Sequence, residues 1–274
     1  MSYDLHTHST YSDGSYSPLE LVHYAREKKL EGLSITDHDS IEAYPEVLAV
    51  GKDHHIQILP GVEFSCHYKG QSVHVLGYSF DFTHQTLLAF CLKHKKRRHQ
   101  RNAEILGKLK EIGFSIAEKE LENCAKGAIG RPHIAQLLLE KGYVIDIPQA
   151  FKLYIGDGKK CYAPGITFTL EETLSVIHEA KGLAVLAHPH LYHSPFFVKE
   201  LLKFPFDGIE AEYSQMSSKK NALWIDLAKK NNLLMTGGSD FHGTIKPTIS
   251  LGATQVKREQ IEPFFNQFYS HHLP

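Results

Sequence analysis

The sequence predicts an α/β fold in which a barrel of alternating strands and helices is interrupted by a helical segment. Short apolar strands that end in polar residues alternate with helical patterns over residues 1–82, and the same rhythm returns over residues 165–274. Between them, residues 83–164 carry only helical patterns. Such alternation is typical of parallel α/β barrels, in which reactive groups collect at the carboxyl ends of the strands. We therefore expect a functional site at that end.

Composition is that of an ordinary globular protein of 274 residues, apart from its histidines. The 30 Lys and Arg residues balance 31 Asp and Glu residues, so the overall charge gives no reason to expect nucleic-acid or membrane binding. The 19 histidines do require an explanation. Imidazole is the commonest metal ligand and titrates near neutral pH, so a metal or acid–base site is indicated.

The cysteines and the N-terminus indicate a reducing compartment. Cys66, Cys91, Cys124 and Cys161 are far apart and form no CxxC pair, which favours neither a thiolate zinc site nor a disulfide framework. The chain opens without a basic segment and apolar h-region, and no apolar run is long enough to span a membrane. We expect free thiols, a cytoplasmic location and no membrane contact, and no stable protein partner is evident.

The first strand carries two histidines and is followed by a loop with an acidic residue. Side chains two residues apart on a strand project from the same face, so His6 and His8 are placed to reach one metal ion. Asp13 follows in the loop just beyond the strand. The alternative is a strand whose two histidines hold no ligand. The other strand ends decide between these interpretations.

The next elements follow the α/β rhythm. Ser17 is a candidate N-cap and Pro18 a first helical residue, and a helical apolar stripe follows them. Strands are predicted at 32–36, 56–64 and 72–80, and a helix is predicted at 41–54. Lys69 and Gly70 turn the chain between the last two strands.

Helical patterns at 86–112, 116–124 and 132–139 predict an inserted lid or cap domain over residues 83–164. The barrel would then comprise residues 1–82 and 165–274. In its second part we expect helices at 170–181, 195–203, 217–231 and 258–269, and strands at 183–187, 208–213 and 233–236.

Nine polar residues fall at or near the predicted strand ends, from at least six separate segments: His6, His8, Asp13, His38, Glu63, His74, His188, Asp240 and His242. A single histidine on an apolar strand is more often a satisfied core residue than a ligand. Nine such groups at one end of one architecture would be costly to bury without partners. A nitrogen and oxygen ligand set suits zinc, manganese or iron, and nine ligands suit two to three divalent ions. Such ions would provide a hydroxide at neutral pH.

Six ordered motifs, DLHTHSTYSDG, SITDHD, GVEFSC, HVLGY, AHPH and GGSDFHG, resemble those of the PHP (polymerase and histidinol phosphatase) metal-dependent phosphoesterases. The resemblance spans nearly the whole chain, and it implies a distorted (β/α)7 barrel with a trinuclear metal centre. It implies that His6, His8, Glu63 and Asp240 hold one ion. Glu63 would bridge to a second ion held with His74 and His188. Asp13, His38 and His242 would hold the third.

The segment IGRPHIA at 129–135 resembles the branch of the family that removes phosphate from nucleoside 3′,5′-bisphosphates and trims short RNA from its 5′ end. Pro132 can open a helix, which places Arg131 at a helix N-terminus, where free N–H groups and a guanidinium favour phosphate. The alternative is an ordinary helix start with a surface arginine. His133 is expected to contact the same phosphate or to protonate the leaving oxygen.

Other features carry weaker signals. The basic run 93–101 is expected to be a solvated helix, with guidance of an RNA chain as the alternative. The loop 156–160 is expected to be a solvated turn rather than a phosphate loop. Asp37 and Asp39 point away from His38 and are expected to support ligands or cap the backbone. His67, His190 and His193 are not expected to be metal ligands.

The predicted function is hydrolysis of a phosphate monoester by a metal-bridging hydroxide. The expected substrate is the 3′-phosphate of a nucleoside 3′,5′-bisphosphate, or the 5′ end of a short RNA. One alternative is a phosphatase of histidinol-phosphate type. Another is a non-catalytic RNA-binding or metal-sensing module, which the complete set of ligands argues against.

Overall fold

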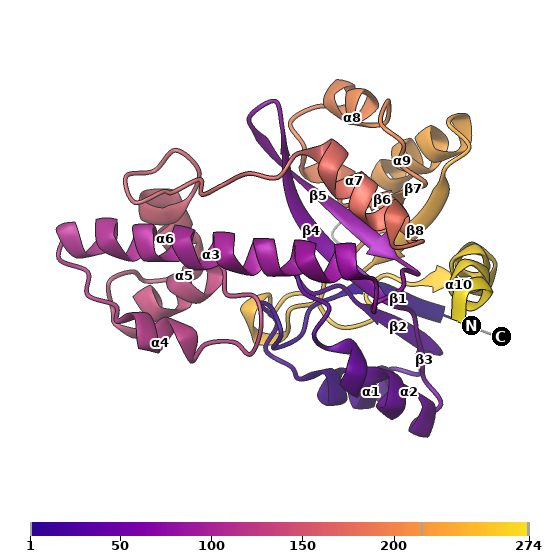
Figure 1. The fold of residues 1–274 in the computed structure, drawn as a ribbon, viewed down its shortest axis with the longest axis horizontal. Helices are drawn as coiled ribbons and strands as arrows, with labels where there is room; N and C mark the ends of the chain where they lie inside the picture. The colour runs from indigo at the N-terminus through magenta and orange to yellow at the C-terminus, as the bar shows by residue number, and fades with distance from the viewer. Residues whose placement is uncertain (1, 215, 273–274) are drawn as a thin grey trace.

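The computed structural model describes residues 2–214 and 216–272, which form an α/β fold with two mixed sheets (Figure 1). The first sheet has the order β3-β2-β1-β9 and contains β1 (Ser2–Thr7), β2 (Gly32–Ile35), β3 (Gln57–Ile58) and β9 (Val256–Lys257). The second has the order β4-β5-β6-β7-β8 and contains β4 (Gly61–Tyr68), β5 (Gln71–Tyr78), β6 (Leu183–Leu186), β7 (Gly208–Tyr213) and β8 (Leu234–Gly238). The predicted α/β class is confirmed.

Two isolated backbone bridges join the sheets just beyond their strands. Thr7 pairs with Phe241 after β8, and His38, after β2, pairs with Glu63 on β4. Both bridges involve segments that carry predicted site residues. No strand ladder connects the two sheets among the described residues, so the predicted distorted (β/α)7 barrel stays a prediction.

The strand directions depart from a wholly parallel barrel at β5, which runs antiparallel to both β4 and β6. The cause is the two-residue turn at Lys69 and Gly70, which have positive φ angles of 49° and 76°. Such a turn closes a hairpin and leaves no room for the crossover helix that a parallel pair requires. The single strand predicted at 56–64 is likewise divided into β3 and β4 on either side of Pro60, which lacks an N–H for a sheet ladder.

Helices cover the sheets and largely match their predicted positions. Helix α1 (Pro18–Glu27) begins with the predicted N-cap Ser17, whose hydroxyl accepts from Glu20 N–H at 3.3 Å while Glu20 accepts from Ser17 N–H. The others around the sheets are α2 (Tyr44–Asp53), α7 (Leu170–Glu179), α8 (Pro195–Leu201), α9 (Ser218–Lys230) and α10 (Arg258–His272). Within the described residues, no helix combines the length and apolarity needed to cross a membrane. All four cysteines are free, as predicted.

Residues 83–164 are helical and contain no strand, as predicted. They form α3 (Gln85–Glu111), α4 (Glu118–Glu122), α5 (Arg131–Glu140), α6 (Ile147–Ala150) and a π-helical turn (Phe151–Ile155). These elements lie together on one side of the molecule (Figure 1) and have their own apolar cluster, which includes Ile105, Leu109 and Leu138. The first half of α3 packs against the main core through Leu87 and Phe90, so this helix links both parts. The domain boundaries at 82/83 and 164/165 stay a proposal.

Candidate metal centre

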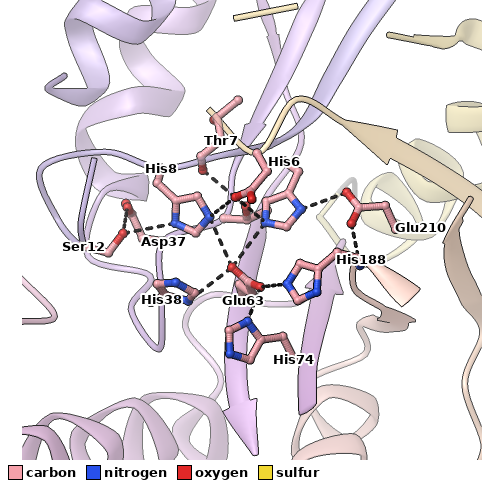
Figure 2. A network of polar contacts seen from close by, with 12 residues as sticks. His6, Thr7, His8, Ser12, Asp37, His38, Glu63, His74, His188 and Glu210 are labelled. Atoms are coloured by element: carbon pink, nitrogen blue, oxygen red, sulfur yellow. Dashed lines mark hydrogen bonds and ion pairs between the residues drawn. The ribbon is translucent and has the colours of Figure 1, made fainter. Parts of the chain in front are cut away.

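Glu63 lies at the centre of a ring of histidine side chains (Figure 2). Its carboxylate is buried on β4, and each oxygen faces several imidazole nitrogens. Oε2 lies 3.2 Å from His6 Nε2, His8 Nε2 and His38 Nδ1. Oε1 lies 2.7 Å from His74 Nδ1 and 2.9 Å from His188 Nε2. Five of the predicted site residues therefore converge on one carboxylate.

Strand geometry explains this convergence. His6 lies on β1 and His8 directly follows the strand, with Thr7 between them, so both rings point to the same side. Ser65 pairs with His74 across the β4–β5 ladder, and Glu63 is two residues from Ser65, so Glu63 and His74 are diagonal neighbours on one face. His38 and His188 follow the ends of β2 and β6.

The three remaining predicted residues, Asp13, Asp240 and His242, lie beside His8. Asp13 Oδ1 is 3.6 Å from His8 Nδ1 and 3.4 Å from His242 Nε2. Asp13 Oδ2 is 3.8 Å from His38 Nε2. Asp240 Oδ1 is 3.4 Å from both His8 Nε2 and His242 Nδ1. All nine predicted residues are thus brought together.

Three overlapping groups have donor atoms that all lie within 4.8 Å of one another. They are His8, Asp13, His38 and His242; His6, His8 and Asp240; and His38, Glu63 and His74. His188 falls outside these groups but contacts Glu63 directly. The groups share His8 and His38, so neighbouring sites would be close enough to share ligands.

The side chains fit divalent cations. Every donor is nitrogen or oxygen, as Zn, Mn and Fe accept. Several buried donor atoms have no hydrogen-bond partner among the described residues, including His8 Nε2, Asp13 Oδ1 and His38 Nδ1. Buried polar atoms are nearly always satisfied in folded proteins, so unpaired atoms that point at one another indicate a missing positive partner.

The charges of the cluster are strongly coupled. Burial would raise the pKa of Glu63, but His38, His74 and His6 hold that pKa well below its usual range. Burial lowers the pKa of His38 to about 3. Burial also acts to lower the pKa of His8, but the neighbouring carboxylates of Asp240 and Glu63 raise it to about 9. Glu63 is therefore an anion at neutral pH, as a bridging ligand must be.

Glu210, on β7, is a site residue that sequence reasoning missed. It is buried, its Oε1 lies 2.8 Å from His6 Nδ1, and its Oε2 accepts from the backbone N–H of His188 at 2.7 Å. It therefore fixes the ring of one histidine and the backbone of another. A signal was available, because a glutamate in the middle of a predicted buried strand requires a partner.

Asp37 holds the loop that carries Asp13 and, as predicted, does not face the cluster. It accepts from Ser9 N–H at 2.7 Å and from the hydroxyls of Ser9 and Ser12 at 2.6 Å each. Asp4 has a similar role at the other end, where it accepts from the N–H and hydroxyl of Ser239, the residue before Asp240.

Asp39 pairs with the basic run, so the solvated-helix interpretation of 93–101 is wrong for one face of α3. Oδ2 of Asp39 accepts from Arg97 Nη2 at 3.0 Å and from Arg98 Nε at 2.7 Å, and His94 Nδ1 lies 3.0 Å from Oδ1. His94, Arg97 and Arg98 are buried, whereas residues 93, 95, 96, 99 and 100 are exposed. The buried face of α3 therefore contacts a carboxylate in the segment that follows β2.

A cleft lies beside the cluster, and residues from both parts of the molecule line it. Asp13, His38 and His74 line it, together with Arg97, Arg98, Arg101 and Arg131. Arg131 is the first residue of α5, as predicted. It forms an ion pair with Asp157, and its guanidinium lies over the Tyr162 ring at 5.5 Å. His133 is buried, and its Nδ1 accepts from Gly130 N–H at 3.0 Å.

The features set aside in the sequence lie outside the cluster. In the loop 156–160, Asp157 pairs with Arg131, and Lys159 and Lys160 are exposed, as expected of a solvated turn. His193 is exposed and contacts Gln71, and His190 is partly buried against Tyr213. His67 lines the cleft, and within the described residues its side chain forms no hydrogen bond or ion pair with any of the nine predicted ligands.

Comparison with known proteins gives a consistent result. The PHP domain family matches residues 4–147. The chain is 35% identical to the 5′-3′ exoribonuclease Rnm of Escherichia coli over 91% of this chain and 88% of the relative. It is 28% identical to a 3′,5′-nucleoside bisphosphate phosphatase of Chromobacterium violaceum, over 92% and 91%. Among solved structures, one from Bifidobacterium adolescentis assigned as a metal-dependent phosphoesterase has a TM-score of 0.88 and 26% identity, over 97% of this chain and 96% of that one.

Proposed function

The chain belongs to the PHP domain family and is a metal-dependent phosphoesterase, and from this premise we propose that it hydrolyses the 3′-phosphate of nucleoside 3′,5′-bisphosphates or releases nucleotides from the 5′ end of short RNA. One observation carries the substrate proposal. The cleft is lined both by candidate metal ligands and by four arginines. A nucleotide with two phosphates would match both sets of residues.

We propose two to three divalent ions, Mn, Fe or Zn, held by the nine predicted ligands. His6, His8, Glu63 and Asp240 would hold one ion; Glu63, His74 and His188 a second; Asp13, His38 and His242 a third. When bound, such ions supply Lewis acidity and lower the pKa of coordinated water. The overlap of the three donor groups at His8 and His38 supports closely spaced ions.

The chain's own residues prepare this site. Glu210 accepts a hydrogen bond from the Nδ1–H of His6, so the ring would present Nε2 towards Glu63 and Asp240. Asp37 and Asp4 hold the backbone on either side of the cluster, which limits the movement of Asp13 and Asp240. These bonds favour a site formed before the ions bind.

Arg131 and His133 would bind the phosphate that does not react. Arg131 is fixed by its aromatic neighbours and offers a guanidinium to the cleft. Because His133 Nδ1 accepts a bond from Gly130, the proton of the neutral ring lies on Nε2. Burial lowers the pKa of His133, which favours the neutral ring at pH 7. The residue is thus better suited to donate a hydrogen bond to phosphate than to protonate a leaving oxygen.

We propose that residues 83–164 act as a cap that supplies this second phosphate site, while residues 1–82 and 165–274 form the distorted barrel that supplies the metal ligands. The separate apolar cluster in the helical part supports this division. The Asp39 ion pairs would keep the two parts in register.

The test is a substrate panel with metal-loaded protein. It includes a nucleoside 3′,5′-bisphosphate, a short 5′-phosphorylated RNA and histidinol phosphate, with released phosphate and mononucleotides as readouts. We expect turnover of the first two and little of the third. The His38→Ala variant should lose turnover, whereas a non-catalytic binding module would keep its RNA affinity in that variant. Wild-type protein that is inactive on both nucleic-acid substrates would refute the substrate proposal.

A further inference from the structure

Four arginines meet at the cleft, and three of them already have a carboxylate partner. Arg97 and Arg98 pair with Asp39, and Arg131 pairs with Asp157. Arg101, the fourth, has no ion pair with any described residue. Within the described part of the chain its side chain forms one hydrogen bond, a long one from Nη2 to Asn102 Oδ1 at 3.5 Å.

The guanidinium of Arg101 is poorly satisfied for its location. Its Nε is buried and has no hydrogen-bond partner among the described residues. A guanidinium has five N–H donors, and desolvating them without acceptors is costly. Burial, and then Arg98, Arg131 and Arg97, lower the pKa of Arg101 well below its usual range. Because arginine stays protonated in proteins, this environment is unfavourable for the guanidinium unless an anion lies beside it.

The balance of charge indicates the missing partner. The four arginines carry four positive charges, and Asp39 and Asp157 carry two negative charges, so two positive charges are not compensated within this group. A terminal phosphate monoester is close to a dianion at neutral pH, whereas a phosphodiester carries a single charge. Planar guanidinium groups bind phosphate oxygens in a bidentate manner.

We propose that Arg101 is a substrate-binding residue that selects nucleotides with a terminal 5′-phosphate, by supplying the uncompensated charge of the cleft. This inference rests on the proposed function and deepens it. Arg97 and Arg98 connect α3 to Asp39, and Arg131 exchanges Asp157 for phosphate. Arg101 has no carboxylate partner to exchange among the described residues and meets the phosphate directly.

The kinetic test compares two substrates that share the scissile 3′-phosphate, a nucleoside 3′,5′-bisphosphate and the nucleoside 3′-monophosphate. In Arg101→Met we expect kcat/KM for the bisphosphate to fall about 10- to 100-fold, the range for lost charged hydrogen bonds. Activity on the monophosphate should stay within about twofold of wild type, and Arg101→Lys should recover part of the loss. Lys96→Met, which removes an exposed charge from the same helix, is the control. Equal losses on both substrates, or no loss on either, would overturn the assignment.

A binding test is independent of turnover. Inorganic phosphate should raise the Tm of metal-depleted wild-type and Lys96→Met protein but not of Arg101→Met. Without phosphate, Arg101→Met should be at least as stable as wild type, because an uncompensated charge has been removed. An equal phosphate response in Arg101→Met would overturn the proposal, as would a lower Tm in this variant without phosphate. Inactive metal-loaded wild type with an Arg101-dependent phosphate response would overturn the substrate proposal and support the anion site.

Discussion

Glu63 and Asp39 are two buried carboxylates in adjacent segments of backbone, and their partners differ in kind. The N–H of Asp39 donates to the carbonyl oxygen of Glu63 at 2.9 Å, so a backbone hydrogen bond joins the two segments. Glu63 faces five histidines. Asp39 faces two arginines and one histidine. In both residues the surrounding groups hold the carboxyl pKa well below its usual range.

The difference lies in whether the positive charge is permanent. Arginine is always charged, so the positive charge that faces Asp39 comes from the protein itself. Histidine is charged only when protonated, and a cluster of neighbouring rings cannot all be charged at little cost. The Glu63 cluster is therefore suited to positive charge from outside the chain. A carboxylate compensated by fixed cations stabilises structure, and one surrounded by histidines prepares a binding site.

The strongest test of this contrast is Glu63→Gln. An amide cannot supply the negative charge of the proposed bridging ligand, so bound metal should fall and phosphate release should drop about 10³-fold, comparable to the loss of other strong transition-state electrostatic groups. Stability without metal should change little, because the histidines can become neutral. Metal analysis, phosphate release and urea unfolding provide the three readouts. A variant with wild-type metal content and activity would show that Glu63 is not a ligand.

The matching change on the other side is Asp39→Asn. Removing one partner from a buried ion pair leaves two uncompensated arginines, which costs about 3–5 kcal/mol of unfolding free energy. Urea unfolding measures this. Asp207→Asn, which weakens the partly exposed pair with His178, should cost less than about 1 kcal/mol and is the control. A similar small loss in both variants would contradict the structural role of Asp39.

The same pair predicts a pH dependence with a definite sign. The pKa of Asp39 is lowered in the folded protein, whereas the unfolded value is about 3.9. Its contribution to stability is therefore fully present above the unfolded pKa and is lost as pH falls through the folded pKa. The difference in unfolding free energy between wild type and Asp39→Asn should be constant from pH 6 to 8 and shrink below about pH 4. A difference that already shrinks near pH 6 would point to His94 instead.

The sequence was sufficient to predict the candidate ligands at the strand ends. It was not sufficient to predict the residues that hold these ligands in place. His6, His8 and Glu63 could be predicted because strand alternation and chain order place them at one end of the sheets. The antiparallel direction of β5 could have been predicted too, since Lys69 and Gly70 are a two-residue turn. Glu210 was missed because nothing local to β7 indicates that its partners lie on β1 and after β6.

Helix α3 shows a harder limit. Its buried stripe contains Phe90, His94, Arg97 and Ile105, at helical spacing, so it mixes apolar and charged residues. A charged residue on a helix normally marks the solvated face. These charged residues are buried because Asp39 lies opposite them in the folded protein. No pattern in the sequence shows that Asp39 lies there.

Glu210→Gln tests how far the histidine cluster depends on support from its own chain. The amide still fills the space but loses the charge that fixes and polarises His6, so metal affinity should fall about 10- to 100-fold. Competition with a chelator measures this, and excess metal should restore most of the activity, unlike in Glu63→Gln. Glu212→Gln is the matched control, because Glu212 lies two residues along β7 and contacts Gln260 instead of a histidine. Equal effects of the two variants would remove Glu210 from the site.

The smallest expected effect comes from Asp157, the other carboxylate that pairs with an arginine of the cleft. Its side chain is 64% exposed, so its pair with Arg131 contributes little to stability and can be replaced by a phosphate, unlike the buried pair of Asp39. Asp157→Asn should therefore lower KM for a nucleoside 3′,5′-bisphosphate about two- to fivefold, leave kcat unchanged and change the unfolding free energy by less than about 1 kcal/mol. Glu118→Gln, which removes an exposed carboxylate paired with His99 on the same helical part, should change none of these values. A higher KM in Asp157→Asn would mean that Asp157 positions Arg131 for phosphate rather than competing with it, and exposure would then fail to separate displaceable ion pairs from structural ones.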